Sequence, residues 1–146
     1  MEKQNLSFLE ISRRMKAMDL PAFDVVLGIG RGGIVPASML AHQLKCDLKI
    51  VNLNYRDDEN HPRFDEPRLK GKSQDLRSIS GTVLIVDDVS VSGKTLSTAK
   101  SLLSNCQVST LVCKGEADFV LFPEVRNCVN WPWKTSLLTI ASEEST

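Results

Sequence analysis

The sequence lacks a surplus of charge of either sign, and it lacks long hydrophobic runs. Lys plus Arg and Asp plus Glu both number 18, so the formal net charge is zero. A neutral chain offers no broad basic surface for non-specific binding to nucleic acid or to an anionic membrane. The apolar stretches fall short of the roughly 18 residues of a membrane span. The N-terminal 16 residues are charged and contain no apolar core of a secretory signal. We therefore expect neither nucleic acid nor a membrane as partner.

Cysteine is scarce, and its spacing excludes two classes of protein. Cys46, Cys106, Cys113 and Cys128 form no CxxC pair and have no histidine at the spacing of a metal site. The pattern predicts reduced, mostly buried thiols in a cytoplasmic protein. Disulfide-rich secreted domains and zinc fingers are excluded as classes.

Length and composition indicate one globular domain. The 146 residues, 42% of them hydrophobic and 25% charged, match the averages of folded domains rather than those of disordered chains. A chain of this size can bury a sizeable core. No repeat or internal boundary divides it, so we expect a single domain over residues 1–146.

Hydrophobic periodicity predicts helices and strands in alternation. Ser7 and Glu10 form a capping box, and Leu6 and Ile11 form the accompanying hydrophobic staple, so a first helix begins here. Further helices are expected over residues 34–45 and 95–104, and strands over residues 23–29, 48–53, 82–86, 108–113 and 136–140. This order predicts an α/β fold: a mostly parallel twisted sheet flanked by helices.

Residues 55–80 differ in character from the rest of the chain. They carry many charges, two prolines and little apolar periodicity. Loops of this length are uncommon inside compact domains, and they are often functional. We expect a long flexible loop here.

A glycine-rich loop follows the first predicted strand. Residues 28–33 satisfy GxGxxG between a strand and a helix, the setting of a dinucleotide fingerprint. That fingerprint also needs an acid at the end of the next strand, to hold a ribose hydroxyl. Asn52, Leu53, Asn54 and Tyr55 stand there instead, so dinucleotide binding is a minor alternative.

A second loop resembles the end of a Walker A motif but fails as one. Gly93, Lys94 and Thr95 match the motif, yet the position that requires its first glycine is occupied by Asp88. A carboxylate there would repel the phosphates that the loop must hold.

The same second loop suits a sugar phosphate. Asp87 and Asp88 follow an apolar strand, and their carboxylates can accept hydrogen bonds from ribose hydroxyls or hold Mg²⁺-bound water. The free amides at the next helix start, with the hydroxyls of Ser90, Ser92 and Thr95, can bind a phosphate dianion. The acid pair and this loop together predict a sugar-phosphate site at the carboxyl edge of the sheet.

Residues 83–95 (VLIVDDVSVSGKT) resemble the ribose-phosphate signature of the type I phosphoribosyltransferases. Residues 30–36 are similar to the pyrophosphate loop of the xanthine and hypoxanthine-guanine branch. Asn54-Tyr55 resembles the start of that branch's flexible catalytic loop. Residues about 114–134 resemble its small purine-binding hood. The resemblance covers roughly residues 23–134, and it implies the type I phosphoribosyltransferase fold with that hood.

The resemblance also implies roles for the residues that would bind phosphoribosyl pyrophosphate. Asp87 and Asp88 would contact the ribose hydroxyls, directly or through Mg²⁺. Arg31 and Gly32 would bind pyrophosphate. The 5′-phosphate would be wrapped, mainly by backbone amides, by Val91, Ser92, Gly93, Lys94 and Thr95.

Further roles concern the base and the loop. Lys114 would donate to the purine 6-oxo group, and Val120 would read the base edge through its backbone. An aromatic residue, Phe119 or Trp133, would stack on the base. Tyr55 and its loop would close over the reacting centre.

Together these roles imply a purine phosphoribosyltransferase of nucleotide salvage, acting on xanthine, guanine or hypoxanthine, with Mg²⁺ as cofactor and a homodimer as its assembly. Two departures from the family pattern support an alternative function. The 6-oxopurine branch usually has an Asp where this chain has Val91, and Asn54 replaces the usual Ser. The alternative is a non-catalytic or regulatory protein of the same fold that binds phosphoribosyl pyrophosphate or a nucleotide.

Overall fold

The computed structural model describes residues 3–54, 68–69 and 76–134. Two predictions fall wholly or mainly outside these ranges: the strand at 136–140 and the role of Tyr55 with most of the 55–80 loop. Within the described part of the chain, no helix is long and apolar enough to cross a membrane.

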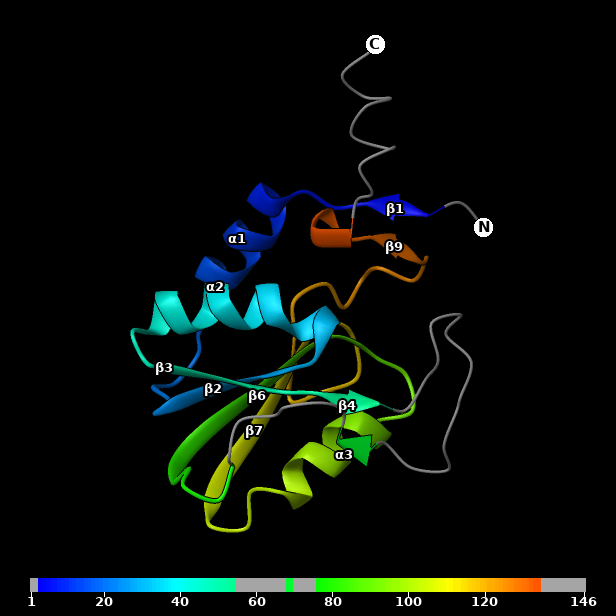
Figure 1. The fold of residues 1–146 in the computed structure, drawn as a ribbon. Helices are drawn as coiled ribbons and strands as arrows, with labels where there is room; N and C mark the ends of the chain where they lie inside the picture. Colours follow the sequence, from blue (N-terminus) through cyan, green and yellow to red (C-terminus); the bar gives the residue numbers. More distant parts are fainter. Residues whose placement is uncertain (1–2, 55–67, 70–75, 135–146) are drawn as a thin grey trace.

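A five-stranded parallel sheet forms the centre of the molecule (Figure 1). Its strand order is β3-β2-β6-β7-β8. The bounds are β2 Val25–Ile29, β3 Asp47–Val51, β6 Gly81–Ser90, β7 Cys106–Gly115 and β8 Phe119–Val120. Every pairing in this sheet is parallel, so the carboxyl ends of the strands share one edge. The predicted fold class is confirmed.

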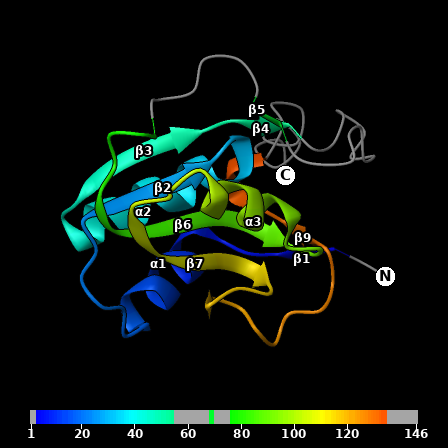
Figure 2. The same ribbon diagram turned by 90° about the horizontal axis from the view of Figure 1, so that it is seen from below.

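Helices cover both faces of this sheet (Figures 1 and 2). The helices α1 (Phe8–Ala17) and α2 (Ile34–Leu44) lie on one face, and α3 (Lys94–Ser101) lies on the other. Ser7 caps α1 as predicted, since its Oγ accepts a hydrogen bond from the Glu10 amide at 3.1 Å. The helix α3 ends three residues before the predicted limit at residue 104.

Successive side chains of β6 point to opposite faces of the sheet, so its buried residues belong to two separate cores. Leu84 and Val86 pack in the cluster that holds α1, α2 and the hood. Val83 and Ile85 pack in the cluster that holds Leu96 and Ala99 of α3. Because β6 is buried on both faces, it reads in the sequence as a continuous apolar run, as central parallel strands do.

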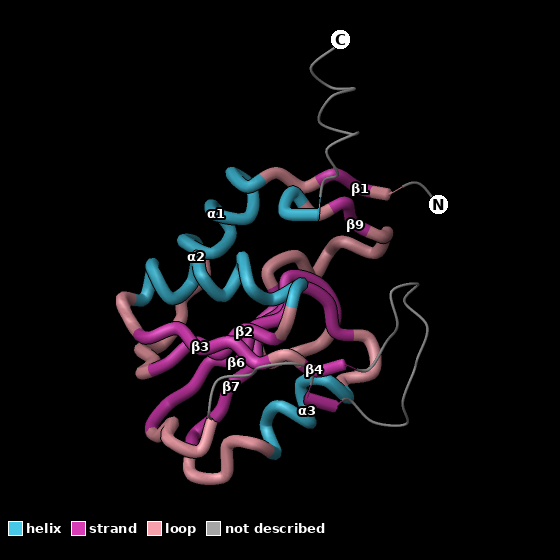
Figure 3. Tube along the Cα trace, in the orientation of Figure 1, coloured by secondary structure: helices cyan, strands magenta, loops and turns pink. Residues whose placement is uncertain are grey.

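Two short strand pairs accompany the main sheet (Figure 3). The strand β1 (Gln4–Asn5) pairs in parallel with β9 (Val129–Asn130). The strand β4 (Leu53–Asn54) pairs antiparallel with β5 (Arg68–Leu69), so one short element lies within the predicted 55–80 loop. Neither pair was expected from the sequence, because two-residue strands carry no periodicity. Two 3₁₀ turns, η1 (Arg31–Gly33) and η2 (Pro132–Lys134), complete the described elements.

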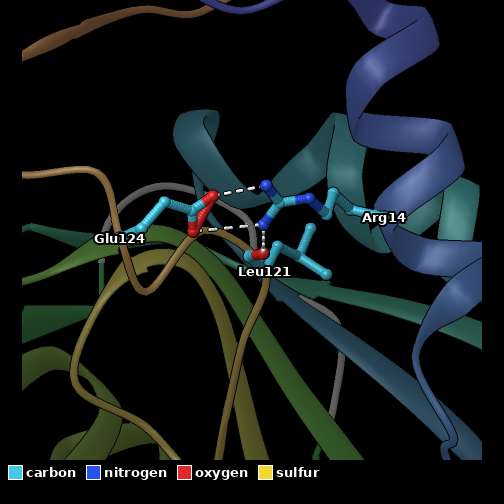
Figure 4. A network of polar contacts seen from close by, with 3 residues as sticks. All are labelled: Arg14, Leu121 and Glu124. Atoms are coloured by element: carbon cyan, nitrogen blue, oxygen red, sulfur yellow. Dashed lines mark hydrogen bonds and ion pairs between the residues drawn. The ribbon is translucent and has the colours of Figure 1, made fainter.

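One arginine of α1 makes polar contacts with the hood (Figure 4). Nη1 of Arg14 donates to the Leu121 carbonyl at 2.7 Å and to Oε2 of Glu124 at 3.2 Å, while its Nη2 contacts Oε1 of Glu124. The guanidinium also lies over the Phe122 ring, 4.6 Å from the ring centre. Arg14 thereby connects the first helix to a segment more than 100 residues away in the sequence.

Candidate functional site

A cavity of about 600 Å³ opens at the carboxyl edge of the sheet, between the end of β6 and the hood. The residues that line it come from four separate stretches of the sequence. Residues 87–93 with Thr95 and Leu96 form one wall, and Lys114 lies next to the end of β7. The remaining lining residues are Lys3, Cys128, Val129, Trp131 and Lys134. Open α/β sheets bind ligands in this position.

The acid pair lies inside β6 and not after its end. The predicted strand ended at Val86, but β6 continues to Ser90 because its pairing with β7 extends to Gly115. The Asp88 amide donates to Oδ1 of Asp87, and the Val89 amide donates to Oδ1 of Asp88, both at 2.8 Å. Extended backbone therefore holds both carboxylates in place, and both line the cavity.

The two carboxylates have different electrostatic surroundings. The pKa of Asp87 is raised well above its ordinary value, first by burial and then by the negative charge of Asp88. Asp88 is itself buried, but its Oδ2 accepts a hydrogen bond from Nζ of Lys134 at 2.7 Å. Lys134 thus pairs with Asp88, while burial and the neighbouring carboxylate disfavour the charged form of Asp87. A bound cation or several hydroxyl donors would favour that charged form.

The first glycine loop reaches the acid pair. A Cβ built on Gly32 would lie 2.5 Å from the carboxyl carbon and both oxygens of Asp88, and one on Gly33 would lie 2.5 Å from the Val86 carbonyl oxygen. Only glycine allows this approach without a shift. The predicted pyrophosphate loop and the predicted ribose-binding acids are therefore neighbours, although Arg31 is exposed and is not among the cavity-lining residues.

The predicted phosphate loop wraps the start of α3. Gly93 has φ +77°, in the left-handed region where an L side chain is strained, and its carbonyl accepts the Ser97 amide at 2.9 Å. Oγ of Ser92 accepts the Lys94 amide at 3.3 Å. The first amides of a helix have no acceptor within the helix and attract anions. Val91, Ser92, Gly93 and Thr95 line the cavity, whereas Lys94 does not.

Of the residues predicted to bind a base, only Lys114 lines the cavity. Its Nζ donates to the Asn127 carbonyl at 2.7 Å. Phe119 and Val120 form β8, where they pair with Leu111 and Val112 in the sheet and pack against its two cores. Neither residue lines this cavity, and their roles toward a base stay predictions.

The second aromatic residue predicted to stack on the base is also absent from the lining of the cavity, and its role stays a prediction. Trp133 stacks on Trp131, with ring centres 5.3 Å apart and planes 7° apart, and its other neighbour is Phe8 at 6.3 Å. Trp131 is the tryptophan that lines the cavity. Trp133 stands behind it, where it supports the position of the Trp131 ring.

Sequence reasoning missed several residues that the fold brings to the cavity. Lys3 and Val129 both line the cavity, because the strand of residues 4–5 pairs with that of residues 129–130. Cys128 is exposed there, contrary to the expected burial, while Cys113 alone among the four free cysteines is fully buried. The sequence held one indication that Lys134 belongs to the site, namely its position directly after the predicted hood aromatics. Its contact with Asp88 depends on tertiary structure and could not be predicted locally.

In the described part of the chain, no group of three or more acidic, histidine or cysteine side chains could hold a metal ion. Among these described residues, the acid pair supplies two carboxylates without a third ligand of these types. Mg²⁺ is commonly bound by one or two carboxylates together with substrate phosphates and water. Asp87 and Asp88 fit that mode, since they are two adjacent carboxylates that line one cavity. They do not form a closed metal cage.

Comparison with known proteins agrees with this geometry. Residues 11–118 match the model of the phosphoribosyl transferase domain. Xanthine-guanine phosphoribosyltransferase of Roseobacter denitrificans is 28% identical over 130 residues, which cover 82% of this chain and 73% of that protein. Among solved structures, the purine phosphoribosyltransferase of Pyrococcus horikoshii has a TM-score of 0.72 at 24% identity, covering 93% of this chain and 97% of that one.

A Neisseria gonorrhoeae protein solved with bound ppGpp has the same fold, with a TM-score of 0.67 at 24% identity, covering 99% of this chain and 96% of that one. The matched domain spans the acid pair, both glycine-containing loops and most of the sheet. This chain belongs to the phosphoribosyl transferase domain family.

Proposed function

We propose that this protein transfers the 5-phosphoribosyl group of phosphoribosyl pyrophosphate to a purine base, which is xanthine, guanine or hypoxanthine, and releases pyrophosphate in nucleotide salvage. The observation that carries the proposal is the acid pair of β6, which shares one cavity with the loop that starts α3. Family membership and the similarity to xanthine-guanine phosphoribosyltransferases support the reaction and the class of base.

The donor would bind across the two loops. Backbone amides at the start of α3, with the hydroxyls of Ser92 and Thr95, suit the 5′-phosphate. Asp87 and Asp88 suit the ribose hydroxyls as acceptors. Gly32 touches Asp88, so the amides of its loop are near enough to the ribose position to receive pyrophosphate, together with Arg31.

The base would bind between Lys114 and the hood. The Lys114 ammonium is held by the Asn127 carbonyl, which leaves two of its three protons for a 6-oxo group. The buried Trp131 lines the same cavity. We assign to Trp131 the stacking role that the sequence suggested for Phe119 or Trp133.

The reaction needs charge neutralisation more than acid–base chemistry. A purine nitrogen attacks the anomeric carbon while pyrophosphate leaves, through a transition state with oxocarbenium character. Mg²⁺, held at Asp87 and Asp88, would supply positive charge to the leaving group and the ribose hydroxyls. The chain's own part is to position the two reactants and to provide amides and cations where negative charge develops.

The regulatory alternative rests on a specific feature. Val91 is the most exposed large apolar side chain of the described residues, 79% accessible at the mouth of the cavity. It can accept no proton from a purine nitrogen. A protein that binds phosphoribosyl pyrophosphate or a nucleotide as a signal would not need such an acceptor.

The deciding experiment is a mononucleotide-formation assay with Mg²⁺, phosphoribosyl pyrophosphate and six bases in parallel: xanthine, guanine, hypoxanthine, adenine, orotate and uracil. We expect turnover on a 6-oxopurine and a loss of at least about 100-fold in Asp88→Asn, the scale of a removed electrostatic group. Asp19→Asn, an exposed acid remote from the cavity, is the matched control. No turnover on any base, with donor binding intact, would favour the regulatory alternative.

A further inference from the structure

A lysine ammonium forms an ion pair with the second residue of the acid pair. Nζ of Lys134 lies 2.7 Å from Oδ2 of Asp88. This ammonium stands at the place where the proposed function puts Mg²⁺ and ribose hydroxyls. Both groups line the cavity, so the contact lies within the candidate site.

The two partners of this ion pair differ in how freely they can move. The Lys134 side chain is 54% exposed, whereas that of Asp88 is 11% exposed. Asp88 is further held by the Val89 amide and by the close approach of Gly32. A lysine stem has four rotatable bonds and can turn its ammonium into water at small cost. The contact can therefore open by rotation of Lys134 alone.

The backbone of Lys134 need not move when the contact opens. Its amide donates to the Trp131 carbonyl at 3.0 Å within the turn η2. Trp131 is buried and stacks on Trp133. The turn thus fixes where the lysine is attached, and only the side chain is free to exchange partners.

We propose that Lys134 is an exchangeable counter-ion of the acid pair, which a divalent cation must displace from Asp88 in order to bind. This inference rests on the proposed function only in placing a divalent cation at Asp87 and Asp88. In the absence of the cation, the ammonium offsets part of the repulsion between the two buried carboxylates. When the cation binds, the Lys134 side chain rotates away from Asp88 into water.

The test measures binding of Mn²⁺ alone, followed by the electron paramagnetic resonance signal of the free ion, without any substrate. Removing the competing ammonium in Lys134→Met should lower the Mn²⁺ dissociation constant by about threefold to fivefold, the range of an exposed ion pair. The difference between wild type and variant should shrink in high salt, which screens exposed charges. Lys134→Arg should remain within about twofold of wild type, because it keeps the charge.

Two further variants separate local competition from general charge. Lys3→Met removes the same charge from the same cavity wall, but Lys3 has no ion pair with Asp88 among the interactions of the described residues. It should change the Mn²⁺ dissociation constant by less than about twofold. Asp88→Asn should abolish the binding. Circular dichroism checks that each variant is folded.

Three results would overturn the inference: equal Mn²⁺ affinity in wild type and Lys134→Met, weaker binding in Lys134→Met, or equal tightening in Lys3→Met. Failure of the proposed function is a separate result, because it is seen as an absence of mononucleotide in the assay with six bases. A protein that turns over a purine but fails the Mn²⁺ test would keep its function and lose only the exchangeable lysine.

Discussion

Asp87 and Asp88 follow each other in one strand, and within the described ranges an ion pair is formed by Asp88 but not by Asp87. The Asp87 pKa is raised in the folded chain, so its negative charge opposes folding. Below about pH 4 both the folded and unfolded chains carry it protonated. As the pH rises from there through the folded-state pKa, the free energy of unfolding decreases. This decrease in the free energy of unfolding is expected at a binding site whose carboxylates are neutralised only when a ligand binds.

Asp87→Asn should therefore stabilise the protein while impairing the site. At pH 7.5 in EDTA, we expect its melting temperature to exceed that of wild type by a few degrees. At pH 4 the difference should be smaller. Thermal melts at pH 7.5 and pH 4 measure the two differences in melting temperature. A lower melting temperature for the variant at pH 7.5 would show that the Asp87 charge does not destabilise the fold.

Gly32→Ala tests the contact between the two loops. The added Cβ would overlap the Asp88 carboxylate, and the main chain or Asp88 must shift. We expect a loss of about 1–3 kcal/mol in unfolding free energy, typical of overpacking, with loss of binding of phosphoribosyl pyrophosphate. Urea unfolding and calorimetry measure the two effects. Gly93→Ala is the contrast, since nothing lies within 4 Å of its added Cβ and only its left-handed backbone is strained.

At the scale of elements, the hood is attached to α1 through Arg14. Arg14 contacts a carbonyl, a carboxylate and an aromatic ring of one segment, residues 121–124. We expect Arg14→Met to raise amide hydrogen exchange in residues 119–130 several-fold while leaving β6 protected. Arg13→Met, the neighbouring exposed arginine of the same helix, is the control. Equal exchange in both variants would show that the hood does not depend on this contact.

The same contact predicts a pH dependence of the hood. Hydrogen bonds from Arg14 hold the Glu124 pKa below its ordinary value. A depressed pKa contributes stability above the unfolded-state pKa and loses it as the pH falls through the folded-state pKa. We therefore expect protection of residues 119–130 to decrease in acid, and Glu124→Gln to remove that dependence. Hydrogen exchange corrected for intrinsic rates measures it.

At the scale of the molecule, the sheet joins two cores into one unit. Leu84 and Ile85 are adjacent in β6 but face opposite cores. Both are fully buried, so each change to Ala should cost about 2–5 kcal/mol. We expect tryptophan fluorescence, which reports on the hood, and far-ultraviolet circular dichroism to show one common urea midpoint in each variant. Separate midpoints in Ile85→Ala alone would mean that the two cores unfold independently.

The homodimer that the family resemblance implies is also a property of the whole molecule, and it remains a prediction. Sedimentation at several protein concentrations would measure it. The Phe8 and Leu9 side chains of α1 are about half exposed, and a dimer that covered them would protect the α1 amides as concentration rises.

Local sequence patterns determined most of the fold and the composition of the site. Val83–Val86 could only be a doubly buried strand, and Ser7 with Glu10 marked the first helix start. The acid pair and the loop of residues 91–95 could be predicted from the sequence because each is formed by residues that are consecutive in the chain. The chemistry of these residues needs no distant partner, so their local pattern was sufficient.

The tertiary structure alone decided which hood residues face the cavity and what neutralises the acid pair. Phe119 and Val120 have the composition of a base-binding segment, but parallel pairing with β7 places them in the sheet. Lys134 meets Asp88 across 46 residues, and Lys3 reaches the cavity through a two-residue strand. Such contacts follow from the packing of elements far apart in the chain. No periodicity or spacing within a single segment encodes them, because the partner that fixes each residue lies elsewhere in the sequence.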